Sequence, residues 1–96
     1  MRNLDEIRVD IDAIDKELVE LFKRRMDCAK EVGLYKQANG IPVLNRQREE
    51  EILDRIQQMG GEYGAYARLL YGNIMELSRS LQHNMVHSGE ALRAEI

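Results

Sequence analysis

Residues 4–35 read LDEIRVDIDAIDKELVELFKRRMDCAKEVGLY, and apolar side chains recur along this stretch at alternating steps of three and four residues. Every seventh residue from Leu4, with a companion row three residues later, marks the a and d positions of five heptads. These positions are Leu4, Ile11, Leu18, Arg25 and Val32, with Ile7, Ile14, Leu21, Cys28 and Tyr35. The spacing predicts one long amphipathic helix that packs along an apolar seam.

Arg25 is the exception in this seam, because the other nine positions can be buried. A guanidinium stays charged, and burying it without an anionic partner is costly. Arg25 therefore either extends its charge to solvent or meets a negative group. A polar residue at an a position commonly sets helix register, so a structural role for Arg25 stands beside a ligand-binding one.

The composition predicts a single small all-α domain. The chain has 96 residues, of which 44% are hydrophobic and 32% charged, with one Pro, no Trp and one Phe. Such a composition favours helix over sheet, and a chain this short is expected to bury surface against another subunit. The net charge of −3, with bases interleaved among acids, argues against general nucleic-acid binding.

The chain shows no pattern typical of export or membrane insertion. Met1 to Asp12 carries six charged side chains, unlike a signal peptide, and no apolar stretch suits a transmembrane helix. The lone Cys28 cannot form an internal disulfide, and we expect it to be a small buried side chain. A cytoplasmic protein without a membrane partner is therefore expected.

The first helix is expected from about Asn3 to Gln37. Asn3 suits the N-cap position, and acids follow it in the first turn, where the helix dipole favours them. A helix of this length spans roughly 50 Å. It cannot bury its stripe against two short neighbours from its own chain, so a second copy is expected to cover it. The sequence Asn39–Gly40–Ile41–Pro42 predicts its end.

Two more helices are expected after this break. The second spans about Val43 to Met59 and ends at a Gly-Gly pair, and the third spans about Glu62 or Tyr66 to Met85. We expect residues 1–86 to form the domain and residues 87–96 to form a frayed C-terminal tail.

Three basic side chains lie near the seam of the long helix. Arg25 and Lys36 are eleven residues apart, which puts them on one face with about 16 Å of rise between them. Arg8 is about 25 Å from Arg25 along the helix and cannot join them from the same chain. If two copies cross antiparallel near Leu18 and Val19, Arg8 of the partner falls between Arg25 and Lys36. A symmetric dimer would then hold two equivalent basic sites.

Polar residues also extend the apolar faces of the other two helices. They are Asn45, Arg48 and Glu49 in the second helix, and Ser78 and Gln82 in the third. These polar groups stand where hydrophobic ones would be expected, and an arginine can bind a carboxylate through two hydrogen bonds. The pattern predicts a pocket for a small carboxylate-bearing molecule.

The order of these residues resembles that of the all-helical chorismate mutases. The resemblance covers about Leu4 to Gln82, and the segments that carry it are 4–8, 14–25, 32–36, 42–49, and Ser78 with Gln82. It implies an intertwined homodimer of three-helix chains that rearranges chorismate to prephenate, toward phenylalanine and tyrosine, without a metal or other cofactor.

The resemblance also implies a role for each site residue. Arg8 of the partner and Arg25 would hold the two carboxylates of chorismate, with Arg48 and Ser78 on the carboxylate side. Lys36 and Gln82 would donate to the ether oxygen, and Glu49 would bind the ring hydroxyl. Asn45 stands where close relatives often carry Asp. It serves if that contact is made mainly through the backbone, whereas a contact that depends on the side-chain charge would lower the affinity.

Other interpretations remain open at this point. Isochorismate-pyruvate lyases share the fold and similar basic residues, while Glu49 and Ser78 favour the mutase. A helical dimerisation module, with Arg25 paired to an acid of its partner, would have no activity. His83 and His87 are four residues apart, but they have no third ligand nearby, so no metal site is expected.

Overall fold

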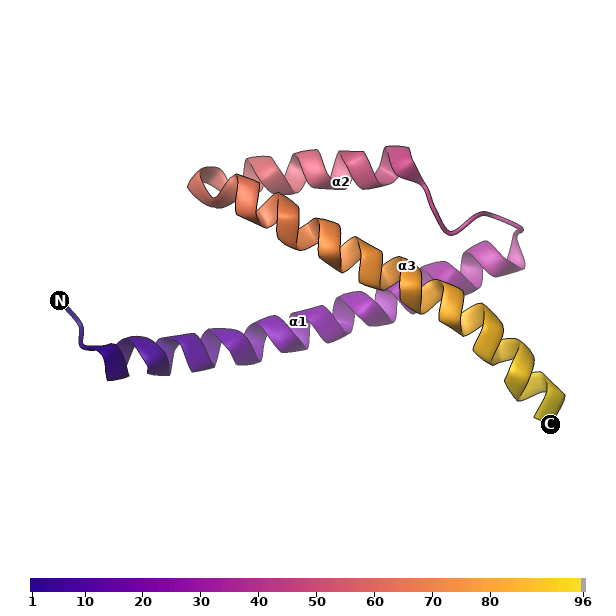
Figure 1. The fold of residues 1–96 in the computed structure, drawn as a ribbon, viewed down its shortest axis with the longest axis horizontal. Coiled ribbons are helices and arrows are strands. Elements are labelled where there is room, and N and C mark those ends of the chain that lie inside the picture. The colour runs from indigo at the N-terminus through magenta and orange to yellow at the C-terminus, as the bar shows by residue number, and fades with distance from the viewer. Residues whose placement is uncertain (96) are drawn as a thin grey trace.

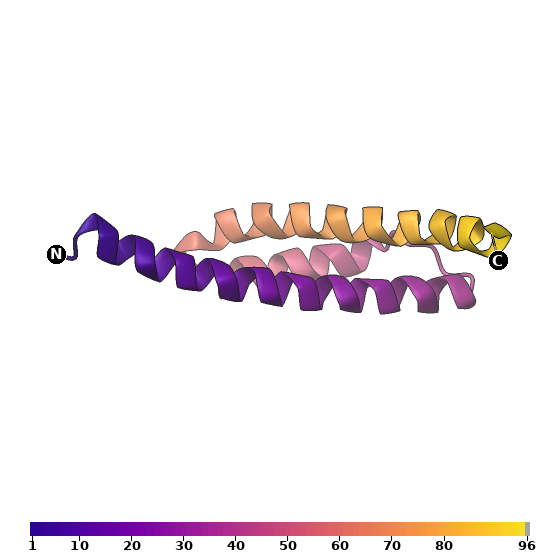
Figure 2. The same ribbon diagram turned by 90° about the horizontal axis from the view of Figure 1, so that it is seen from below.

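The computed structural model describes the backbone of residues 1–95 and the side chains of residues 1–85. The described chain is all-helical: α1 (Leu4–Ala38), α2 (Arg46–Met59) and α3 (Gly64–Glu95), with a 3₁₀ turn, η1 (Gly61–Tyr63), between the last two. α2 and α3 form a hairpin, and α3 crosses the C-terminal half of α1 (Figure 1). Seen edge-on in Figure 2, the helices form a thin slab, and the extents are 59 × 32 × 14 Å.

α1 is a 35-residue helix whose ends follow from local chemistry. The side chain of Asn3 accepts a hydrogen bond from the Glu6 backbone N–H at 2.9 Å, which satisfies one free donor of the first turn. At the other end, Gly40 has a φ of 65°, a left-handed conformation that glycine adopts without strain. The turn directs the chain back across the C-terminal half of α1.

α2 begins at Arg46, three residues later than the start predicted at Val43. The reason is Asn45, whose Oδ1 accepts from the Arg48 N–H at 3.1 Å and thereby caps the helix. Pro42 therefore lies in the connecting loop rather than in the first turn of α2. The loop runs back along α1, and the carbonyl of Val43 accepts from Nζ of Lys36 at 2.7 Å.

α3 continues past Met85 to Glu95, so the helix end predicted near Met85 was wrong. Ser88 and Gly89 weaken a helix but do not stop it, because neither lacks a backbone N–H as proline does. A division of the chain at residues 86 and 87 stays a prediction. The side chain of His87 lies outside the described residues, so the His83–His87 pair cannot be placed.

Arg68 links α3 to α2 on the outside of the hairpin. Its guanidinium donates to Asp54 Oδ1 at 2.9 Å, Gln57 Oε1 at 3.0 Å and Glu50 Oε2 at 2.8 Å. The hydrogen bond to Asp54 raises the pKa of Arg68 above its ordinary value. These contacts fix the two helices against each other at a distance from the loop 39–45.

The apolar stripe of α1 is uncovered in the single chain. Leu18 and Leu21 are 55% and 53% exposed, whereas the buried apolar side chains are Ala29, Ile56 and Met75. The N-terminal half of α1 projects away from the other helices (Figure 1). Within residues 1–95, no helix combines the length and apolar character needed to cross a membrane.

Candidate active site

A cavity of about 340 Å³ opens between the C-terminal half of α1, the start of α2 and the middle of α3. Its volume lies within the usual range for a small-molecule site. Seven of the eight predicted site residues line it: Arg25, Lys36, Asn45, Arg48, Glu49, Ser78 and Gln82. The fold therefore brings together residues up to 57 positions apart in the sequence (Arg25 to Gln82, 82 − 25).

The cavity has an excess of positive charge. Four of its lining residues are cationic, namely Arg25, Lys36, Arg48 and Arg79, and one, Glu49, is anionic. Such a concentration of like charge in a concave site attracts ligands of the opposite charge. The arrangement fits a small molecule that carries more than one negative group.

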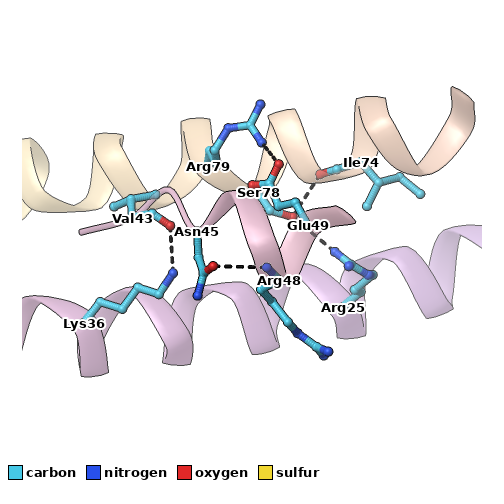
Figure 3. A network of polar contacts seen from close by, with 9 residues as sticks. All are labelled: Arg25, Lys36, Val43, Asn45, Arg48, Glu49, Ile74, Ser78 and Arg79. Atoms are coloured by element: carbon cyan, nitrogen blue, oxygen red, sulfur yellow. Dashed lines mark hydrogen bonds and ion pairs between the residues drawn. The ribbon is translucent and has the colours of Figure 1, made fainter. Parts of the chain in front are cut away.

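Arg25 points toward α3, where two neighbours hold it (Figure 3). Its Nη1 donates to Ser78 Oγ at 3.3 Å, and its guanidinium carbon lies 5.5 Å from the centre of the Tyr71 ring. Ser78 Oγ in turn donates to the Ile74 carbonyl at 2.9 Å, so its lone pairs face Arg25. Among the side chains of residues 1–85, Arg25 forms no ion pair, and its other donors remain available for a ligand.

Lys36 and Gln82 reach the cavity from opposite helices. Lys36 donates one of its three protons to the Val43 carbonyl, which orients the ammonium and leaves two donors. Gln82 is 7% exposed, and its buried Oε1 has no hydrogen-bond partner among the described residues. A buried polar atom without a partner is destabilising, and a catalytic role is one of the explanations for keeping it.

Arg48 and Asn45 lie at the mouth of the cavity. The Arg48 side chain is 56% exposed, and its Nη1 lies 4.0 Å from Glu51 Oε2. Figure 3 shows Arg48 directed away from Ser78. The carbonyl oxygen of the Asn45 side chain is occupied by the cap of α2, so its amide nitrogen is the group left for a ligand.

Arg79 is a cavity residue that sequence reasoning missed. It precedes Gln82 by three residues, so helical spacing puts it beside Gln82. Its Nη1 donates to Oε1 of Glu49 across the α2–α3 contact (Figure 3). Cys28, expected to be buried, is exposed and borders the same cavity.

Arg8 stands apart from the other predicted residues. It is exposed on the projecting N-terminal part of α1 and does not line the cavity of its own chain. A helix is stiff over this distance, so no local change can bring Arg8 to Arg25 within one chain.

The described chain is all-helical, and the charge and size of its cavity suit a small, multiply negative molecule. The chain belongs to the chorismate mutase type II family, whose model matches residues 7–83. It is 32% identical over 85 residues to a chorismate mutase of Methanocaldococcus jannaschii, covering 85% of this chain and 86% of that one.

Three further relatives are informative. A 4-amino-4-deoxychorismate mutase of Streptomyces venezuelae is 29% identical, over 96% of this chain and 91% of that protein. The T-protein of Haemophilus influenzae is 31% identical over 70 residues, which cover 73% of this chain and 19% of that protein. A solved structure of a conserved hypothetical protein from Pyrococcus furiosus superposes with a TM-score of 0.67, at 32% identity, over 82% of this chain and 93% of that one.

Proposed function

We propose that this chain is a chorismate mutase that converts chorismate to prephenate. The observation that supports this function most directly is the cavity, because seven residues that the family resemblance assigns to the substrate line one space with excess positive charge. Chorismate carries two carboxylates, which matches that charge. We place the activity in the cytoplasm as part of the same proposal.

The reaction needs positioning and charge stabilisation rather than a nucleophile. One C–O ether bond breaks while one C–C bond forms, and no electrons or protons are exchanged with the protein. Arginines that hold both carboxylates restrict the flexible side chain of the substrate to a reactive conformation. In the proposed mechanism Arg25 and the partner's Arg8 serve this role, Arg48 completes the carboxylate side, and Ser78 steadies Arg25.

Lys36 and Gln82 act on the developing charge in this mechanism. As the ether bond breaks, negative charge grows on its oxygen, and fixed hydrogen-bond donors stabilise that charge more than they stabilise the substrate. Lys36 retains two N–H donors after its hydrogen bond to the Val43 carbonyl. Glu49 accepts from the ring hydroxyl, and Asn45 contributes at the cavity mouth.

The proposed active form is an antiparallel homodimer in which Arg8 comes from the partner chain. Two observations support it: the apolar stripe of α1 is exposed in one chain, and Arg8 is remote from its own cavity. Crossing two copies near Leu18 and Val19 would bury the stripe and bring each Arg8 to the other chain's Arg25. α1 would then supply both the dimer interface and a substrate-binding arginine.

The test is to mix the purified protein with chorismate and follow the loss of its ultraviolet absorbance, with prephenate identified as the product. Isochorismate with pyruvate detection is the parallel assay. Prephenate formation supports the proposal, and pyruvate release from isochorismate alone would identify a lyase instead. Inactivity on both, in a protein that is dimeric in solution, would leave a dimerisation module.

A further inference from the structure

Arg79 and Glu49 form an ion pair in the wall of the cavity. Nη1 of Arg79 donates to Oε1 of Glu49, and both side chains are partly buried, at 31% and 24% exposure. Among the described residues, Oε2 of Glu49 has no hydrogen-bond donor. The pair therefore presents one free carboxylate oxygen at a fixed place in the cavity wall (Figure 3).

The positive charge of Arg79 offsets the repulsion between the Glu49 carboxylate and a negatively charged ligand. A bare carboxylate near a ligand with two negative charges repels it, and the repulsion is strong where water is partly excluded. Arg79 compensates the charge of Glu49 and keeps the carboxylate as an acceptor. The planar guanidinium of an arginine also fixes the direction of the carboxylate better than the flexible ammonium of a lysine would.

Arg79 is not alone in joining α2 and α3, because Arg68 bridges them as well. Arg68 contacts Glu50 and Asp54, whose side chains are 64% and 73% exposed, and none of these three residues lines the cavity. The hairpin thus has two arginine bridges of the same kind, one outside the site and one inside it. The position of the inner bridge points to a role toward the ligand.

We propose that Arg79 is a positioning residue that acts through Glu49 and makes the site select a substrate with an uncharged hydroxyl, rather than an ammonium group, at the point Glu49 contacts. This inference rests on the proposed function. An ammonium group on the ligand would be attracted by an unpaired Glu49 carboxylate. When Arg79 is paired with that carboxylate, the attraction is largely cancelled and the ammonium is disfavoured. A neutral hydroxyl donates to Oε2 equally well in the presence of Arg79 and brings no charge to repel.

The experiment compares chorismate with 4-amino-4-deoxychorismate, in which an amine replaces the ring hydroxyl. An aliphatic amine is protonated at neutral pH. We expect Arg79→Gln to raise KM for chorismate by about tenfold or more, the scale of one charge-assisted interaction. The ratio of kcat/KM for chorismate to that for the amino substrate should fall by at least about the same factor. Arg79→Lys, which keeps the charge, should recover most of the ratio.

Arg68→Gln is the matched control, because it removes the other α2–α3 bridge without touching the cavity. It should lower Tm and leave the substrate ratio unchanged. The double variant Glu49→Gln/Arg79→Gln tests whether Arg79 acts through Glu49, since the ratio should then equal that of Glu49→Gln alone. This comparison also serves if Arg79→Gln does not fold by itself.

Three outcomes would overturn the inference. Equal losses on both substrates in Arg79→Gln, with a fall in Tm like that of Arg68→Gln, would make the inner bridge structural. A change in the ratio on adding Arg79→Gln to Glu49→Gln would show that Arg79 does not act through Glu49. Inactivity of the unaltered protein on both substrates would overturn the proposed function as well, which distinguishes the two failures.

Discussion

Gly33 of α1 lies directly against Gln82 of α3. A Cβ built on Gly33 would stand 2.9 Å from Cγ and 3.3 Å from Cβ of Gln82, closer than such carbons pack. Both residues are buried, and the Gln82 side chain fills the space that a larger residue at position 33 would need. The missing side chain of Gly33 therefore decides where the Gln82 amide lies in the cavity.

Gly33→Ala should lower kcat by about tenfold. In the proposed mechanism a displaced Gln82 stabilises the ether oxygen poorly, and loss of a whole such donor costs about 100-fold or more. Stability should change little, since alanine gains about 0.5–1 kcal/mol of helix propensity against the steric cost. Gly72→Ala is the control, because a Cβ there meets nothing within 4 Å. Steady-state kinetics and thermal melts measure both effects, and full activity of Gly33→Ala would contradict the argument.

Gln82→Glu should shift activity toward acid pH. An amide donates a hydrogen bond at any pH, whereas a carboxyl donates only when protonated, and an ordinary glutamic acid has a pKa of about 4.3. Activity of the variant should therefore fall as pH rises through the pKa of the new carboxyl, relative to the unaltered protein. A pH–rate profile of kcat checks this, and undiminished activity of the variant at pH 8 would remove Gln82 from its assigned role.

Arg25→Ala and Arg8→Ala should each abolish activity and leave the proposed dimer in place, because each removes a proposed carboxylate contact and no apolar side chain of the stripe. An equal mixture of the two variants should recover about a quarter of the normal activity after subunit exchange. Half of the dimers would be mixed, and one of the two sites in each would hold both arginines. Activity and light scattering measured on the same mixture test this, and no recovery would count against a site shared between chains.

Tyr71→Leu should raise KM for chorismate by several-fold, because the ring that faces the Arg25 guanidinium contributes about 0.5–2 kcal/mol to holding it. Tyr71→Phe keeps the ring and serves as the comparison. Equal KM values for the two variants would mean that Ser78 alone orients Arg25.

The heptad spacing from Leu4 to Tyr35 contained enough information for the long first helix, since a periodic apolar stripe without Pro admits few other structures. The start of α2 was misplaced because two local signals competed. Pro42 can begin a helix, but the Asn45 side chain, three residues later, accepts from a free N–H of the first turn. This cap sets the start of α2.

The cavity residues could be found from the sequence where a polar group interrupts an apolar face, as Arg25 and Gln82 do. Arg79 was missed because charge at the edge of a helix face is common on exposed surfaces, and its partner Glu49 is 30 residues away. Such pairs become visible only when the crossing of two helices is known. The roles of the site residues stay predictions until the substitutions are made.

α3 carries four of the contact residues on one continuous helix: Tyr71 and Ser78 contact Arg25, Arg79 contacts Glu49, and Gln82 lies against Gly33. Inserting or deleting a single residue between Tyr71 and Gln82 would turn one end of this set by about 100° relative to the other. Length variation in this segment therefore destroys the cavity even when every residue type is retained. Lineages that alter the length of this chain are expected to do so in loops such as 39–45, and the spacing within α3 is as much a part of the site as the side chains themselves.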